Sequence, residues 1–242
     1  MVKVTRAARS SKHDCSQLAF SFRQQHLTTF LKQQHQHFMD SISATFPRVQ
    51  LELPQWITAF LQQQPATFPS REARMDLVTT LSKLNIEKGT GGPFGAGVFR
   101  ADTHQLVAPG VNLVLSSHSS IAHAEMVAIM VAQQILRSHD LGATDLPQYE
   151  LVTSCEPCAM CLGAICWSGV RYLVCGARGS DAEAIGFDEG PKPDKWTTAL
   201  EQRGITVTLN IERHKAAQVL QNFVEQDGKV YNSRQGKITN HR

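Results

Sequence analysis

Apolar residues along the chain alternate between helical spacing and short strand-like runs. Intervals of three and four residues predict helices at 53–61, 75–86, 123–136 and 213–224. Short runs rich in branched and aromatic residues predict strands at 97–99, 106–115, 150–153, 170–176 and 205–211. Pro157 suits the first turn of a further predicted helix at 157–167. Strands that alternate with helices in this way predict an α/β fold with helices packed on a central sheet.

A glycine-rich stretch, Gly91-Gly92-Pro93-Phe94-Gly95, follows the helix predicted at 75–86. Glycine richness alone would suit a phosphate-binding loop, but the Lys-Ser/Thr pair of such a loop is missing here. We therefore expect a tight entry into the next strand, with the backbone close to another part of the chain.

The first fifty residues differ in charge from the rest. They carry seven Lys and Arg and two Asp, a formal charge of +5, whereas the remainder carries −2 and the whole chain +3. Eleven glutamines lie between residues 17 and 64. His35 and His37 would suit a metal-binding tract only if a Cys or a carboxylate stood beside them. The prediction is a basic, Gln/His-rich, flexible extension at 1–48 and one domain at 49–242.

Composition narrows the class of protein. The 242 residues are 42% hydrophobic and 19% charged, which is typical of a globular protein and excludes a disordered or collagen-like chain. No apolar run reaches 18 residues, so we expect no membrane span. Five of the six cysteines crowd between 155 and 175, which suits a metal site better than disulfides and predicts a reducing, cytoplasmic compartment. The slightly acidic body argues against a nucleic-acid partner.

Two short motifs carry the candidate metal chemistry. Cys158 and Cys161 stand three apart at the start of a predicted helix, so they share one face, and a helix N-terminus favours thiolates. His123, at the start of another predicted helix, adds a nitrogen ligand. Three such ligands leave one position of a tetrahedral zinc ion open for water, which is the catalytic pattern.

Glu125 lies two residues beyond His123, where its carboxylate can reach that water without binding the metal and can move protons. Either motif alone is weak, because Cys-x-x-Cys is more often a redox or structural zinc motif and His-x-Glu is common by chance. Together, in this order and each at a helix start, they match the signature of zinc-dependent nucleobase deaminases.

From about residue 52 to residue 235 the chain resembles the bacterial guanine deaminases of the cytidine deaminase superfamily. The matching segments, in the family's order, are 91–95, Asn112, 122–125, 153–167 and 183–189. The resemblance implies a three-layer α/β/α sandwich with a central mixed sheet and one catalytic zinc per subunit. It also implies a homodimer that exchanges its C-terminal segment around Tyr231 and Asn232. The first fifty residues have no counterpart in this family.

The resemblance assigns the metal and proton chemistry to individual residues. His123, Cys158 and Cys161 would bind zinc. Glu125 would be the general acid and base, and Glu189 would protonate the departing amino group. For Glu189 the alternative is an ordinary acidic turn exposed to solvent.

The resemblance also implies which residues bind the substrate. Asn112 would hydrogen-bond to the edge of a purine, while Phe94, Trp167 and Phe187 would form walls or stack on the base. Ordinary core packing is the alternative for the aromatic residues, and for Trp167 the two interpretations are about even. The remaining nearby cysteines are expected in the interior: Cys155, Cys166 and Cys175.

The function implied is hydrolytic deamination of guanine to xanthine and ammonia, as in purine catabolism, by a zinc-dependent aminohydrolase acting on cyclic amidines. A tRNA-specific adenosine deaminase is one alternative, but it would need a basic groove for its substrate. Deamination of another amino heterocycle, such as a triazine or a nucleoside, is a second. A non-catalytic zinc protein is a third, and the presence of Glu125 argues against it.

Overall fold

The computed structural model describes Lys32 and residues 50–232. The extension predicted at 1–48 lies outside the described residues, apart from Lys32. The strands are β1 (Gly95–Arg100), β2 (Leu106–Val111), β3 (Tyr149–Cys155), β4 (Tyr172–Ala177) and β5 (Thr206–Thr208). The helices are α2 (Gln55–Leu61), α3 (Arg71–Glu87), α4 (Ala124–Leu136), α5 (Ala159–Ser168), α6 (Gly179–Ala184), α7 (Trp196–Glu201) and α8 (Arg213–Glu225).

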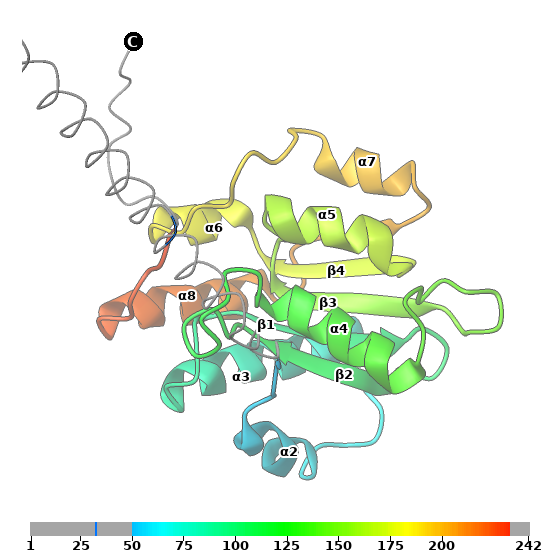
Figure 1. The fold of residues 1–242 in the computed structure, drawn as a ribbon, viewed down its shortest axis with the longest axis horizontal. Helices are drawn as coiled ribbons and strands as arrows, with labels where there is room; N and C mark the ends of the chain where they lie inside the picture. The colour runs from blue at the N-terminus through cyan, green and yellow to red at the C-terminus, as the bar shows by residue number, and fades with distance from the viewer. Residues whose placement is uncertain (1–31, 33–49, 233–242) are drawn as a thin grey trace, which may run out of the picture. The chain divides into compact units, whose positions relative to one another are not determined.

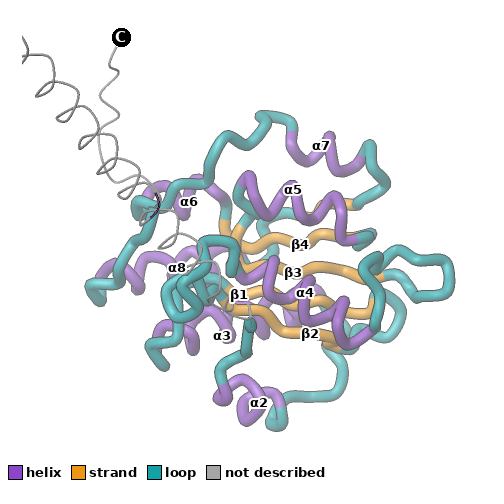
Figure 2. The backbone as a smooth tube through the Cα atoms, viewed as in Figure 1, coloured by secondary structure: helices purple, strands orange, loops and turns teal. Residues whose placement is uncertain are grey.

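The five strands form one mixed sheet in the order β2-β1-β3-β4-β5. Figure 2 shows β2, β1, β3 and β4 side by side in this order. β1 lies between β2 and β3 and is antiparallel to both. β3, β4 and β5 are parallel, and the connections between them contain helices, as parallel strands require.

Helices cover both faces of the sheet. α4 and α5 lie on one side, and α3 and α8 lie on the other, as Figure 1 shows. Successive strand residues point to opposite faces. Leu151 and Leu173 accordingly pack in the core beneath α4 and α5, whereas Val152 and Val174 pack beneath α3. This arrangement is the three-layer α/β/α sandwich with a mixed sheet that the sequence led us to expect.

Several element boundaries differ from the sequence prediction, and two of them lie beside predicted site residues. α5 begins at Ala159 instead of 157, because Cys158 keeps an extended backbone and the Ala159 N–H donates to the carbonyl oxygen of Glu189 at 2.9 Å. β2 ends at Val111 instead of 115, because the chain turns there and the side chain of Asn112 accepts a hydrogen bond from the next turn.

The sequence pattern also missed two helices, α6 and α7. Each has only six residues and carries mainly small or polar side chains, so no apolar periodicity develops. In residues 50–232, no helix combines the length and the apolar character that a membrane crossing would need.

Candidate active site

The chain segments that carry the predicted site residues meet at one edge of the sheet. Strand pairing joins Gly95 at the start of β1 to Val111 at the end of β2, and Ala96 to Thr153 near the end of β3. The glycine-rich stretch, the chain after β2 and the chain after β3 therefore lie together at this edge. β4 is parallel to β3, so the chain that leaves β4 toward Glu189 starts from the same edge.

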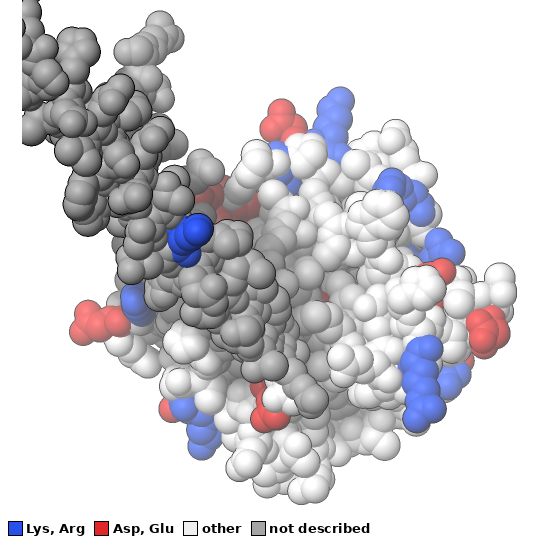
Figure 3. Space-filling view, viewed as in Figure 1, with Lys and Arg blue, Asp and Glu red and all other residues white. Residues whose placement is uncertain are grey.

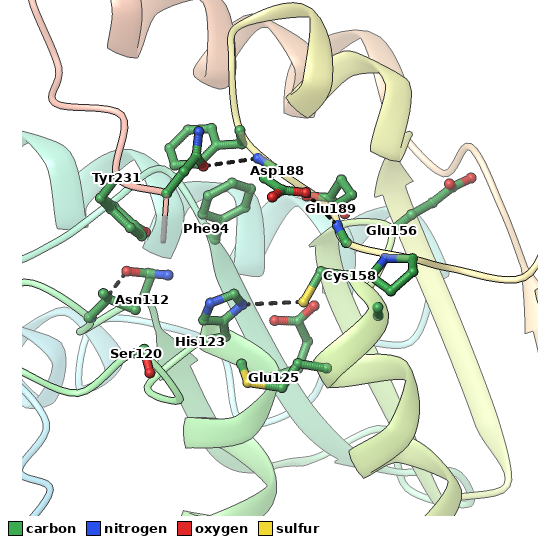
Figure 4. A pocket seen from close by; sticks show the side chains of 17 residues that line it. Phe94, Asn112, Ser120, His123, Glu125, Glu156, Cys158, Asp188, Glu189 and Tyr231 are labelled. Atoms are coloured by element: carbon green, nitrogen blue, oxygen red, sulfur yellow. Dashed lines mark hydrogen bonds between the residues drawn. The ribbon is translucent and has the colours of Figure 1, made fainter. Parts of the chain in front are cut away.

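α4 and α5 both begin at this edge and bring the predicted metal ligands together. His123 immediately precedes α4 and Cys158 immediately precedes α5, and both have an extended backbone. The Nδ1 atom of His123 lies 3.5 Å from the Sγ atom of Cys158, as Figure 4 shows. The ligand atoms of His123, Cys158 and Cys161 all lie within 4.8 Å of one another.

This donor set fits a zinc ion. Bonds of about 2.0 Å to nitrogen and about 2.3 Å to sulfur place tetrahedral ligand atoms roughly 3.5 Å apart, which is the separation between His123 and Cys158. The hydrogen bond with Cys161 lowers the pKa of Cys158 to about 4, in spite of burial. The local interactions therefore favour the thiolate form of Cys158, the form of cysteine that binds zinc, whereas the hydrogen bond with Cys158 and burial raise the pKa of the Cys161 thiol well above its usual value.

Two buried carboxyl groups flank the metal ligands. Glu125 lies in the first turn of α4, and burial together with the charge of Cys158 raises its pKa to about 6. Burial raises the pKa of Glu189 to about 8, again with a contribution from Cys158. A cation bound by the cluster would favour the charged forms of both groups. Carboxyl groups of raised pKa in a cleft are suited to proton transfer near neutral pH.

The metal cluster opens into a cavity of about 630 Å³, a volume suited to a small organic ligand. Phe94 and Phe187 form an apolar wall, with their ring centroids 5.0 Å apart in an edge-to-face arrangement. Asn112 lies next to Phe94, to whose carbonyl oxygen its backbone N–H donates at 3.1 Å, and its Oδ1 accepts a hydrogen bond from the backbone N–H of Val114. Figure 4 shows the rest of its amide directed into the cavity.

The chain after α8 closes another side of the cavity. The ring of Tyr231 packs on the edge of Phe187 with 5.4 Å between centroids. The side chain of Asn232 accepts from the N–H of Asp188 at 3.0 Å and donates to the carbonyl of Gly186 at 2.8 Å. Residues from five parts of the chain thus line one cavity.

Asn85 holds the loop after β2 in place, and the sequence pattern missed it. Its buried side chain donates to the carbonyl oxygens of Asn112 at 2.8 Å and Gly92 at 3.0 Å. A Cβ atom at Gly91 would lie only 1.8 Å from the carbonyl oxygen of Asn112. The close backbone approach expected from the glycine-rich stretch is therefore present. The sequence feature that could have identified Asn85 is its place as a polar residue within the apolar pattern of the helix predicted at 75–86.

Trp167, expected either as a wall of the substrate site or in the core, does not line the described cavity. Trp167 lies near the C-terminal end of α5, nearly two turns beyond Cys161, and is 82% exposed. A helix that begins at the site carries its later residues away from it. The sequence match preserves the residue type but does not show the direction in which the side chain points.

The cysteines outside the metal cluster lie mainly in the interior. Cys155 and Cys175 are buried, and burial raises the pKa of both thiols well above the usual value. Cys166 is half-buried, so only part of the expectation for it holds. Neither Cys155 nor Cys175 belongs to the group of potential metal ligands.

Comparisons with known proteins agree with this geometry. Residues 69–177 match the family model described as the cytidine and deoxycytidylate deaminase zinc-binding region. A curated guanine deaminase from Bacillus subtilis is 38% identical over 120 residues, which cover 50% of this chain and 72% of that protein. A tRNA-specific adenosine deaminase from Buchnera aphidicola is 31% identical over 119 residues, which cover 49% of this chain and 72% of that protein.

Solved structures extend the similarity to most of the described residues. The structure of a guanine deaminase from Nitrosomonas europaea is 46% identical with a TM-score of 0.70, and the match covers 75% of this chain and 98% of that chain. The structure of NE0047 in complex with 2,6-diaminopurine is 47% identical with a TM-score of 0.72, over 77% of this chain and 98% of that chain.

The fold, the His-Cys-Cys cluster and these similarities define a zinc-dependent hydrolytic deaminase with a cytidine deaminase-like fold. The chain belongs to the guanine deaminase family of these enzymes.

Replacement of Cys161 by alanine should remove the metal. Two remaining ligands cannot form a stable tetrahedral site, so purified Cys161→Ala should contain far less zinc than the equimolar amount expected of the wild type. Elemental analysis after dialysis measures this, and circular dichroism checks the fold. Cys166→Ala, on the same helix and outside the cluster, is the control and should keep its zinc. Full zinc occupancy in Cys161→Ala would contradict the ligand assignment.

Proposed function

We propose that this enzyme deaminates guanine to xanthine and ammonia, a reaction of purine catabolism. The observation that carries the proposal is one cavity lined by the metal-ligand candidates His123 and Cys158, by Glu125, Glu189 and Asn112, and by an aromatic wall. The cavity suits a free base, and guanine deaminases are the relatives with the higher sequence identity. When bound, zinc would act as a Lewis acid and lower the pKa of water to about 7.

Glu125 is the group that would move the first proton. Its carboxylate takes a proton from water as the new bond between oxygen and C2 of guanine forms, and it passes that proton to a neighbouring ring nitrogen. Its position in the first turn of α4, next to His123 and 6% exposed, keeps competing solvent away from it.

Glu189 is the group that would move the second proton. Its carboxyl group donates a proton to the exocyclic nitrogen as the bond between C2 and that nitrogen breaks, and ammonia leaves. The new hydroxyl group at C2 returns a proton to the Glu189 carboxylate as it becomes the carbonyl group of xanthine. One of its carboxyl oxygens is buried without a hydrogen-bond partner among the described residues. A buried acid that lacks a protein partner is suited to interact with substrate.

The remaining residues would orient the base. The amide of Asn112 hydrogen-bonds to the purine edge, and the rings of Phe94 and Phe187 pack against the base. Tyr231 and Asn232 restrict the space beside this wall. An adenosine within an RNA loop needs room for its sugar and the flanking nucleotides, so this closure favours a free base over the tRNA substrate.

The Glu125→Gln variant tests the mechanism. Glutamine keeps the size of the side chain but cannot accept and return the proton, so turnover of guanine should fall by about 10²–10⁴-fold while zinc remains bound. Ammonia release and elemental analysis measure the two quantities. Glu201→Gln, at an exposed position on α7, is the control and should behave like the wild type. Substantial turnover by Glu125→Gln would overturn this role.

The substrate is tested in the same assay by offering guanine, adenine, cytosine, a triazine and an adenosine-containing tRNA stem-loop. Ammonia release should be fastest from guanine. Faster release from the stem-loop would replace the proposal by the tRNA deaminase alternative, and faster release from a triazine would replace it by deamination of another amino heterocycle.

We also propose that residues 1–48 form an extension outside the catalytic domain at 49–242. The site residues all lie between 94 and 232. The extension is basic, whereas the rest of the chain is slightly acidic. Deletion of residues 1–48 should therefore leave guanine turnover and zinc content unchanged. Loss of solubility or of turnover in the deletion variant would show that the segment belongs to the fold.

The enzyme is further proposed to be a cytoplasmic homodimer that exchanges its C-terminal segment. Figure 3 shows few charged side chains on the described surface over α4 and α5. This surface includes Trp167 at 82% exposure and Ile135 at 59%. Exposed apolar groups of this size commonly mark protein interfaces. With the segment exchanged, Tyr231 and Asn232 would close the cavity of the partner.

A charge on this surface tests the dimer. Trp167→Glu should shift the molecular mass in light scattering from that of a dimer to that of a monomer, because a carboxylate there would be buried without a partner. Lys83→Glu, on the exposed part of α3 across the sheet, is the control and should stay dimeric. A dimeric Trp167→Glu variant would place the interface elsewhere.

A further inference from the structure

The segment that carries Glu189 has no regular secondary structure of its own. It connects α6, which ends at Ala184, to α7, which begins at Trp196. A side chain on such a segment reaches a fixed position only if contacts with other parts of the protein restrain the backbone. Glu189 is nevertheless 8% exposed and directed toward the metal ligands, as Figure 4 shows.

The first restraint acts at Glu189 itself. Its carbonyl oxygen accepts a hydrogen bond from the N–H of Ala159 at 2.9 Å. Ala159 is the first residue of α5 and directly follows the metal ligand Cys158. This bond joins the backbone of the acid to the backbone of the metal-binding motif, but it leaves the segment free to rotate about one point.

The second restraint comes from Lys192, three residues further along. Its ammonium group donates to the carbonyl oxygen of Pro157 at 3.2 Å and lies 3.7 Å from a carboxylate oxygen of Glu156. It also lies 5.1 Å from the centre of the Trp196 ring, within the range of a cation–π interaction. Lys192 thus ties the segment a second time to the residues that precede Cys158.

Glu156 connects this contact to a third element. The carboxylate oxygen near Lys192 also accepts a hydrogen bond from the N–H of Gly179, the first residue of α6, at 3.1 Å. The side chains of Lys192 and Glu156 are only 15% and 12% exposed. An ion pair at this depth is weakly screened by solvent, so both of its charges depend on each other.

We propose that Lys192 is a positioning residue for the deamination reaction, holding the Glu189 segment against the metal-binding motif through Pro157 and Glu156. The inference rests on the proposed function. Two attachments, one at Glu189 and one at Lys192, fix both the distance and the rotation of the segment relative to Cys158. Lys192 does not line the cavity, so it acts through Glu189 and does not contact the substrate.

A double-mutant cycle tests the proposal by measuring kcat and KM for guanine, with zinc content alongside. Lys192→Met removes the ammonium group but keeps most of the apolar stem. It should lower kcat by about 10- to 100-fold, because a displacement of about 1 Å has effects of that size, while KM and zinc content change little. Lys192→Arg should recover much of the loss. Lys195→Met, exposed on the same segment, is the matched control.

The cycle separates positioning from a general structural role. If Lys192 acts through Glu189, Lys192→Met should cause little further loss in the Glu189→Gln background. A full additional loss there, a loss of zinc, or kinetics like those of Lys195→Met would overturn the proposal. Should Lys192→Met fail to fold, Lys192→Gln takes its place, since it removes the charge that pairs with Glu156 and keeps a polar side chain, and kcat should fall in the same direction. Wild-type turnover of guanine in the same assay reports separately on the proposed function.

Discussion

The pairing of β1 with both β2 and β3 fixes where the active site lies. Because β1 is antiparallel to its two neighbours, its first residue stands beside the last residues of both. Strand pairing alone therefore brings together the glycine-rich stretch, Asn112 and the Cys158 motif. Helices that start at this edge then direct their free N–H groups and their first-turn side chains toward one volume.

Placing so many ionisable groups in one volume has an electrostatic cost that a metal ion relieves. Two carboxyl groups and two thiols lie together, and burial and mutual repulsion raise the pKa values of Glu125 and Glu189 to about 6 and 8. A dication at the cluster reverses the sign of the local field. The grouping of acidic side chains that disfavours their negative charges in the metal-free protein therefore favours binding of a metal cation.

The sequence predicted the layers and the metal ligands because both follow local rules. Apolar periodicity identified every strand and the longer helices, and ligand spacing with helix starts identified His123 and Cys158. The sequence did not predict the direction of side chains or contacts between residues that are far apart in the chain. Trp167 has the right type but faces away, and Asn85 and Lys192 act on residues that are distant in sequence or lie in irregular segments. The periodicity of apolar residues does not predict such contacts.

The close approach of Gly91 to Asn112 limits how this enzyme can diversify. A Cβ atom at position 91 would overlap the carbonyl oxygen of the residue proposed to read the purine edge. Any replacement there would push the loop after β2 outward and shift the amide of Asn112 with it. A change of substrate by mutation therefore depends on both positions. Residue 112 can be replaced by another base-recognition residue as long as residue 91 stays glycine, but a side chain at position 91 would displace the loop.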